Sequence, residues 1–208
     1  MLDVAIINYG MGNLFSVFCA CKSIGLNVQI TDDKEVIRNS KILILPGVGA
    51  FGAAMEIIKK KNIDKAIYEH IGKDKKIIGI CLGMQLLFER SYEFTLNKGL
   101  GILKGDVKMF SINESNLLNV GWNKIIKKKK KTLLDLNSEK DKFYFIHSLF
   151  AEPKDTSIIS AISEFNKQTF CCGIKYKNIE AFQFHPEKSA DFGLKIFQSL
   201  KNEMKENF

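Results

Sequence analysis

Short apolar runs alternate with amphipathic stretches along the first half of the chain. The runs at residues 4–7, 28–31, 42–45 and 77–80 are rich in Ile, Val and Leu, as the buried strands of a parallel sheet are. Between them, apolar residues recur at three- and four-residue spacing over residues 13–24, 53–61 and 63–71, which predicts amphipathic helices. This alternation predicts an α/β fold whose mainly parallel central sheet is flanked by helices.

The pattern changes after Phe110. Short strands with hairpin-like spacing are predicted around residues 121–126, 143–149, 158–163, 170–175 and 181–184, and a final helix over residues 191–206. The second half therefore adds antiparallel strands to the sheet. The 208 residues contain no Ser/Gly-rich linker and no internal repeat, so we expect a single domain over residues 1–208.

Composition narrows the class of protein. Hydrophobic residues make up 46% of the chain and charged residues 26%, which is ordinary for a soluble globular protein. No window approaches ~18 consecutive apolar residues, so no membrane span is expected. Because the N-terminal residues lead directly into a predicted strand, a signal peptide is not expected either. The five cysteines lack paired or zinc-binding spacing, which predicts a reducing, cytoplasmic location and no metal site.

The net charge of +8 raises the question of nucleic-acid binding. Much of the excess lies in the lysine run at residues 127–131, which we expect to be solvated at a loop or strand end. No aromatic residues interleave with that run, so a nucleic-acid partner is not expected. The excess lysine would instead reflect genome composition or favour encounter with an acidic face of a protein partner.

The stretch at residues 79–83, Gly-Ile-Cys-Leu-Gly, predicts a nucleophile on a tight turn. An apolar strand over residues 76–80 precedes Cys81, and residues 84–90 show helical spacing. The flanking glycines Gly79 and Gly83 allow the close backbone approach that a sharp strand-to-helix turn needs. The start of the following helix would favour the thiolate, which is the reactive form of cysteine. On this motif alone, Cys81 could equally be a small buried hydrophobe.

A histidine and a carboxylate near the C-terminal end favour the interpretation of Cys81 as a nucleophile. His185 follows the apolar run at residues 182–184, and Glu187 lies two residues further on. In an extended segment these two side chains would project to the same side, so Glu187 could orient a histidine that faces Cys81. This is the nucleophile, base and orienting acid of a triad. The alternative for His185 is a structural histidine; we expect His147 to have a local structural role and His70 to lie on the surface.

With both motifs in place, the chain resembles the class I glutamine amidotransferases. Within that family it most resembles the glutaminase subunits of imidazole glycerol phosphate synthase, which act in histidine biosynthesis. The resemblance runs essentially from end to end, and the similar motifs follow the family's order. They are the segments at residues 8–14, 45–52, 79–89, 98–102, 121–123, 143–148 and 183–189.

The resemblance implies a flavodoxin-like three-layer fold and hydrolysis of L-glutamine to glutamate and ammonia, with no cofactor. Cys81 would attack the side-chain amide, His185 would transfer protons, and Glu187 would support the imidazolium. The family's other site positions fall on two sets of residues in this sequence. The oxyanion would be held by Leu82 and by Gly47, Val48 and Gly49 after a peptide rearrangement, and glutamine by Gln85, Glu93 and Ser148, with Gly49 also at the pocket.

The resemblance also implies a partner, a (β/α)8-barrel cyclase subunit that receives the ammonia and forms imidazole glycerol phosphate and an aminoimidazole carboxamide ribotide. Of the residues expected at its face, Trp122 could alternatively be a core aromatic. The full set is Tyr9, Met11, Asn13, Trp122 and Lys188.

Three departures from the family's usual pattern leave alternatives open. Asn8 stands in place of an aspartate. Residues 118–119 are Leu-Asn rather than Pro-His, and residues 149–150 are Leu-Phe where tyrosines are common. None of them removes a triad member. They lie near the expected partner face, so a paralogous amidotransferase that serves a barrel partner in bacterial surface-sugar biosynthesis is the main alternative. A non-catalytic scaffold is the other.

Overall fold

The apolar runs of the first half form the parallel part of a twelve-stranded sheet. The computed structural model describes residues 2–111, 117–134 and 141–207. Strands β1 (Val4–Ile7), β2 (Val28–Thr31), β3 (Ile42–Leu45) and β4 (Lys76–Ile80) pair in parallel in the order β2-β1-β3-β4. Strand β14 (Ile179–Phe182) then joins β4, also in parallel. Five chain segments therefore end at the same edge of the sheet.

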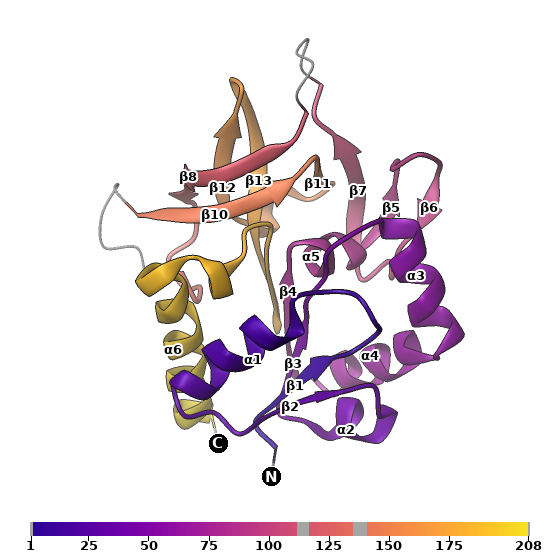
Figure 1. Ribbon diagram of the computed structural model, residues 1–208, viewed down its shortest axis with the longest axis vertical. Coiled ribbons are helices and arrows are strands. Elements are labelled where there is room, and N and C mark those ends of the chain that lie inside the picture. Colours follow the sequence, from indigo (N-terminus) through magenta and orange to yellow (C-terminus); the bar gives the residue numbers. More distant parts are fainter. Residues whose placement is uncertain (1, 112–116, 135–140, 208) are drawn as a thin grey trace.

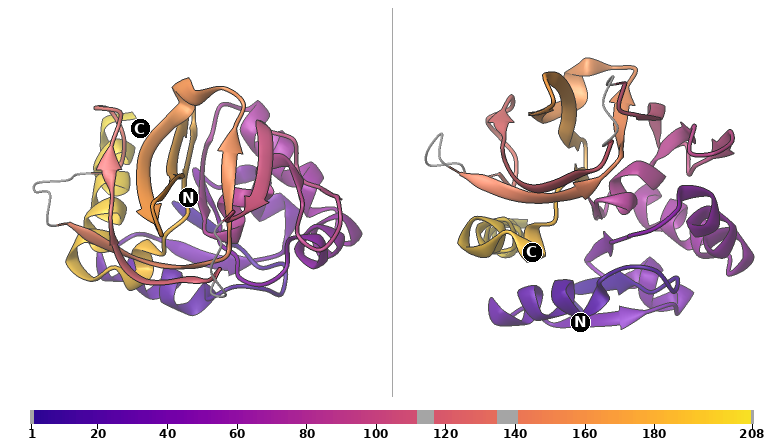
Figure 2. Two further views of the ribbon diagram at one scale, coloured as in Figure 1. Left: turned by 90° about the horizontal axis from the view of Figure 1, so that it is seen from above. Right: turned by 45° about the horizontal axis from the view of Figure 1, so that its top comes forward.

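The second half of the chain supplies mostly antiparallel strands, as predicted. The sheet continues from β14 through β13 (Gln168–Tyr176), β11 (Leu149–Pro153), β7 (Leu103–Met109), β5 (Phe88–Ser91) and β6 (Asn97–Lys98). Strand β12 (Ile159–Phe165) also pairs with β13, and β9 (Ile126–Lys127) pairs with β12. Strands β8 (Asn119–Lys124) and β10 (Lys142–His147) form a separate antiparallel pair. Figures 1 and 2 show this pair curving across the end of the molecule opposite to the two termini.

Helices cover both faces of the parallel sheet. On one face α1 (Leu14–Ser23) and α6 (Ala190–Asn207) pack with Ile6, Ile44 and Ile78 of the strands. On the other face α3 (Phe51–Lys60) and α4 (Ile63–Gly72) pack with Ile7 and Leu43, and α2 (Lys34–Asn39) contacts α4. Alternate residues of each strand thus pack into two separate hydrophobic cores, one on each face of the sheet. The predicted three-layer α/β architecture is confirmed, and Figure 1 shows the two helical layers on either side of the sheet.

Two element predictions were wrong or incomplete. The helical spacing at residues 84–90 gives only the five-residue helix α5 (Leu82–Leu86), because Phe88 begins β5 and pairs with Leu103 of β7. The short helix α2 was not predicted, since it is six residues long and mostly polar; the carboxylate of Asp33 caps it by accepting from the N–H groups of Glu35 and Val36. Two 3₁₀ turns, η1 (Thr156–Ile158) and η2 (Pro186–Lys188), complete the fold.

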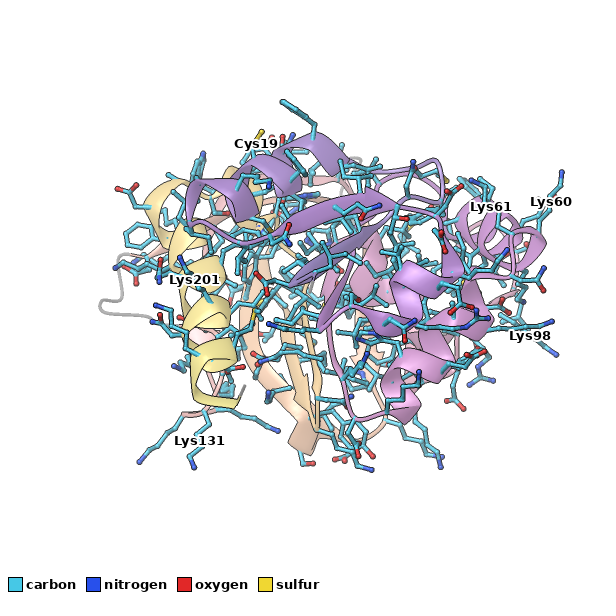
Figure 3. All side chains as sticks on the ribbon, turned by 90° about the horizontal axis from the view of Figure 1, so that it is seen from below. Cys19, Lys60, Lys61, Lys98, Lys131 and Lys201 are labelled. Atoms are coloured by element: carbon cyan, nitrogen blue, oxygen red, sulfur yellow. The ribbon has the colours of Figure 1, made fainter. Side chains whose placement is uncertain are left out.

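The lysine run lies mainly at the surface, as predicted. Lys127 ends β9 and its ammonium donates to the carbonyl of Leu134, while Lys129 donates to the carbonyl of Lys175 at 3.0 Å. Figure 3 shows Lys131 projecting away from the fold. Across the described ranges, none of the helices has both the length and the apolar character needed to cross a membrane.

Candidate active site

Cys81 lies on a strained turn between β4 and α5. Its backbone has φ 53° and ψ −113°, a region that side-chain-bearing residues rarely occupy. The turn is compact because Gly83 lacks a Cβ, which would lie 1.7 Å from the carbonyl oxygen of Leu45. The N–H of Cys81 donates to the carbonyl of Phe182 at 2.7 Å, which ties the turn to β14. The predicted elbow is therefore present, although the helix behind it is short.

His185 and Glu187 form a buried pair directly after β14. The imidazole Nδ1 lies 2.7 Å from Oε1 of Glu187, and both side chains are almost completely buried. The predicted reason for this contact was wrong, because the segment is not extended. His185 instead caps the 3₁₀ turn η2, and that turn brings residue 187 back to the ring.

The charges around His185 favour its protonated form. Burial lowers the pKa of His185, but the Cys81 sulfur and the Glu187 carboxylate outweigh burial and raise this pKa to about 10. Since Nδ1 faces Glu187, the other ring nitrogen is the one available to the sulfur. That Nε2 atom is buried and makes no hydrogen bond within the described ranges. The ring can therefore hold a proton for transfer at the nucleophile.

We expect Glu187→Gln to change how stability depends on pH. A folded-state pKa above the ordinary value of about 6.5 contributes stability fully below about pH 6.5, and this contribution is lost as pH rises through about 10. Removing the carboxylate should lower the pKa of His185 and cost about 1–3 kcal/mol of unfolding free energy at about pH 6. Urea unfolding of parent and variant should show this gap closing toward about pH 10. A gap that stays constant across this range would contradict the assignment.

The segment predicted to hold the oxyanion lies against the nucleophile turn. Gly47 is packed so closely that a Cβ there would lie 2.3 Å from the Tyr9 hydroxyl and 2.9 Å from Cβ of Leu82. Gly49 has φ +98°, a conformation that glycine adopts without strain. Val48 between them is partly exposed. The two groups of oxyanion candidates, at residues 47–49 and at Leu82, are therefore neighbours in space.

A cavity of about 240 Å³ opens beside Cys81. In it, Gln85 is fixed by hydrogen bonds from its Nε2 to the Leu149 carbonyl and to Oε1 of Gln183, each 2.9 Å long. Glu93 accepts from the N–H of Phe51 at 2.5 Å, which holds it at the cavity wall. All three predicted glutamine-binding residues line this cavity together with candidate oxyanion residues. Its lining residues are Val48, Gly49, Cys81, Leu82, Gln85, Glu93, Leu118, Ile146, His147, Ser148 and Leu149.

The residues predicted for a partner face do not all lie at the surface. Trp122 on β8 is 47% exposed and meets the Tyr144 ring edge-on, so the alternative of a core tryptophan is wrong. Lys188 is exposed, and Asn13 caps α1 by accepting from the N–H of Ser16. Met11 is partly buried, with its methyl group near Gly49.

Tyr9 departs from that prediction. It is only 1% exposed, and its hydroxyl donates to the carbonyl of Pro46 at 3.0 Å. Burial, with the nearby Cys81 as a smaller cause, raises the pKa of Tyr9 well above its ordinary value, so the phenol stays neutral. Tyr9 supports the segment that carries Gly47 from inside the fold rather than from a partner face.

The remaining histidines behave differently from each other. The prediction of a surface position for His70 was wrong: its side chain is fully buried, and each ring nitrogen lies 3.0 Å from a backbone carbonyl oxygen, of Ile37 and of Lys76. His147 is buried and hydrogen-bonded, in line with a structural role, although it also lines the cavity. Within the described ranges, His, Cys, Asp and Glu form no group that could hold a metal ion.

Gln183 was not predicted from the sequence as a site residue. This residue is fully buried, and its Nε2 lies 3.7 Å from the sulfur of Cys81. Its signal in the sequence was a position two residues before His185, just beyond Phe182, where β14 ends. A glutamine in an otherwise apolar run was nonetheless not distinguishable from a buried polar residue with a local partner.

Known proteins are similar to this chain in sequence and in fold. The family described as glutamine amidotransferase class-I matches residues 5–199. The imidazole glycerol phosphate synthase subunit HisH of Aquifex aeolicus is 41% identical over 201 residues, covering 96% of each chain, and that of Chlorobaculum tepidum is 40% identical over 198 residues, covering 95% of this chain and 98% of its own. In fold, the chain is similar to a structure of PurLQS from Thermotoga maritima, with a TM-score of 0.76, 19% identity, and coverage of 98% of this chain and 99% of that one.

Proposed function

This chain belongs to the class I glutamine amidotransferase family, and we propose that within it the chain is the glutaminase subunit of an imidazole glycerol phosphate synthase. The observation that carries the proposal is the cysteine turn with its buried His185–Glu187 pair, next to a cavity that Gln85 and Glu93 line. The relatives at about 40% identity are named as subunits of imidazole glycerol phosphate synthase. This name disfavours the alternative of an amidotransferase in surface-sugar biosynthesis. The family match from residue 5 to residue 199 supports a single domain over residues 1–208.

The first chemical step forms a bond between Cys81 and the side-chain carbonyl carbon of glutamine. The thiolate sulfur attacks this carbon, and the C=O electron pair moves onto the oxygen. The N–H of Leu82 and an N–H of the segment at residues 47–49 would stabilise that oxyanion, the latter after a peptide rearrangement at glycine. Loss of one such donor typically costs about 100- to 1000-fold in rate.

The second step breaks the carbon–nitrogen bond. His185 gives its Nε2 proton to the departing nitrogen, which leaves as ammonia, and the γ-glutamyl group remains on sulfur as a thioester. The imidazole, now neutral, takes a proton from a water molecule that attacks the thioester. Glutamate leaves and Cys81 is restored. Glu187 keeps Nδ1 protonated throughout, so the same ring nitrogen serves both steps.

Substrate recognition would use the polar side chains of the cavity. Glu93 supplies a carboxylate that can pair with the α-ammonium group of glutamine. Because both hydrogens of the Gln85 amide are already used, its oxygen is the atom left to accept from the substrate. Ser148 supplies a hydroxyl at the same wall. Each binding group is neutral or negative, which suits the amino end of the substrate.

The ammonia released at Cys81 needs a protected route, because it would be protonated and diluted in water. An exposed apolar patch lies next to the cavity on the outer face of β8 and β10, comprising Val120, Trp122, Tyr144 and Ile146. Ile146 belongs both to this patch and to the cavity wall. We propose that the barrel cyclase subunit docks on the patch and receives the ammonia there, in the cytoplasm, where the free cysteines would stay reduced.

We expect Trp122→Ala to weaken binding of the cyclase subunit by about 10- to 30-fold, because a half-exposed tryptophan on an apolar patch is a typical interface anchor. Titration calorimetry of the two subunits would measure this. Tyr176→Ala is the matched control, since Tyr176 is a similarly exposed aromatic residue at the end of β13. Equal affinities of parent and Trp122→Ala would remove the patch from the interface.

Complementation tests the pathway. A histidine-requiring bacterium that lacks its own glutaminase subunit should grow without histidine when it carries this chain together with the cyclase subunit from the same genome. The Cys81→Ala chain should not restore growth. Failure of the parent chain to restore growth, combined with rescue of a surface-sugar mutant that lacks the paralogous amidotransferase, would overturn the assignment and favour the alternative.

A further inference from the structure

One backbone carbonyl fixes the direction of the hydrogen bonds around the active site. The oxygen of Leu149 lies 2.9 Å from Nε2 of Gln85 and 2.8 Å from Nδ1 of His147. A carbonyl oxygen can only accept, so both side-chain nitrogens must carry the hydrogen. This settles the orientation of the Gln85 amide and the tautomer of His147, which are otherwise ambiguous in a protein structure.

The direction of the next bonds toward the nucleophile follows from this. The Gln85 nitrogen also lies 2.9 Å from Gln183, so the atom of Gln183 that it faces must be the oxygen. The amide nitrogen of Gln183 is then turned toward the sulfur of Cys81, 3.7 Å away. Gln183 is fully buried, and a buried amide is costly unless its polar atoms are used. Here its oxygen accepts from a pocket residue and its nitrogen donates to the nucleophile.

The bonds on the other side of Leu149 lead to β8. With its hydrogen on Nδ1, neutral His147 has a free electron pair on Nε2, which accepts from Nδ2 of Asn119 at 3.0 Å. Oδ1 of Asn119 in turn accepts from Nδ2 of Asn123 at 2.7 Å. Burial lowers the pKa of His147 to about 4, which keeps the ring neutral.

The two faces of β8 therefore have different roles. Asn119 is buried and begins the hydrogen-bonded chain on the inner face, while Val120 and Trp122 are exposed on the outer face. Adjacent residues of a strand point to opposite sides, so movement of the strand under a partner displaces both sets together. The chain from Asn119 through His147, the Leu149 carbonyl, Gln85 and Gln183 to Cys81 is continuous.

We propose that Gln183 is a positioning residue that directs an N–H donor at the sulfur of Cys81, and that Asn119 and His147 link its orientation to strand β8. The role in glutamine hydrolysis rests on the function proposed above, whereas the contact with the sulfur does not. A donor aimed at the thiolate stabilises that form over the thiol. The same bonds hold the Gln85 oxygen toward the cavity, so nucleophile and pocket are set by one network.

The test is the pH dependence of alkylation at Cys81. Iodoacetamide reacts with the thiolate, so the midpoint of the rate against pH reports how readily Cys81 ionises. Gln183→Met keeps the length of the side chain and removes both the donor and the acceptor. The measurement uses the full chain with Cys19, the exposed cysteine, replaced by serine, and follows the Cys81 peptide by mass spectrometry. Gln198→Met on α6 is the control, because Gln198 is exposed and its amide donates to Asn202, which is not part of the network.

In Gln183→Met we expect the alkylation midpoint to move upward by about one pH unit. Asn119→Leu should move it in the same direction by a smaller amount, and Gln198→Met should leave it in place. An unmoved midpoint in folded Gln183→Met overturns the proposal, because a residue that only fills space would give that result. If Gln183→Met does not fold, Asn119→Leu decides in the same way: a raised midpoint supports the network and an unmoved one overturns it.

Glutamine hydrolysis in the same samples separates this proposal from the proposed function. Glutamate release should fall by about tenfold in Gln183→Met when the cyclase subunit is present, through kcat more than through KM. If the parent releases no glutamate with its partner but the midpoint still moves, the proposed function fails and the positioning role stands. If the parent releases glutamate and the midpoint does not move, the proposed function stands and the positioning role of Gln183 fails.

Discussion

Replacing Cys81 with alanine is expected to lower glutamate release by at least about a thousandfold, because the thioester route needs a nucleophile at this turn. The buried Cys171 and Cys172 cannot substitute for it. Burial raises the pKa of Cys171 to about 12 and that of Cys172 well above its ordinary value, which leaves both as inert thiols. Ser148 also lines the cavity, but among the described residues its hydroxyl has no hydrogen bond to a histidine or carboxylate that could act as its base.

Steady-state glutamate release with the cyclase subunit present measures this effect. The control is Cys19→Ala, which removes an exposed cysteine of α1, seen at the surface in Figure 3, and should leave the rate unchanged. Thermal unfolding of Cys81→Ala should show a folded protein, since alanine fills most of the same space. Substantial hydrolysis by folded Cys81→Ala would mean that another group attacks glutamine.

Gly83→Ala is expected to have the largest effect on stability of any single-methyl change at the site. The added Cβ would lie 1.7 Å from the carbonyl oxygen of Leu45 and 2.7 Å from the carbonyl carbon of the same residue. Both are backbone atoms of β3, so relief requires the elbow and the sheet to separate. We expect a loss of more than about 3 kcal/mol, at the upper end of what overpacking costs. Denaturant unfolding would show the transition moved or absent.

Gly72→Ala is the matched control for that experiment. Gly72 ends α4, has no atom within 4 Å of an added Cβ, and has no positive φ. Alanine there should leave stability unchanged or raise it by about 0.5–1 kcal/mol, because it favours the helical conformation. Equal stabilities of the two variants would show that the elbow is not packed against β3 as described.

The strands of the parallel sheet and the turn at Cys81 could be predicted from the sequence. The apolar runs placed β1, β3 and β4, and the glycines around Cys81 indicated the elbow, because strand burial and tight turns leave signals within a few residues. His185 was found in the same way, at the end of an apolar run. Its bond to Glu187 exists for a different reason, since the backbone turns through η2 instead of staying extended.

What the pattern could not supply depends on long-range packing. The stretch after α5 has helical spacing, but pairing with β7 draws Phe88 into a strand. His70 lies in a helix rich in polar residues, yet α2 and β4 cover it and their carbonyls take up both ring nitrogens. Gln183 and Asn119 belong to one network only because strands distant in sequence meet at Leu149. Tyr9 is buried for a similar reason, by its contact with the segment after β3.

Glutamate release from glutamine tests the central claim most directly. It should be measured for the purified chain alone, with the cyclase subunit from the same genome, and with that subunit and its ribotide substrate together. We expect low release by the chain alone, because the oxyanion segment at residues 47–49 must rearrange, and strong stimulation by partner and ribotide together. High turnover by the isolated chain would contradict the need for rearrangement, and no release under any of the three conditions would contradict the glutaminase itself.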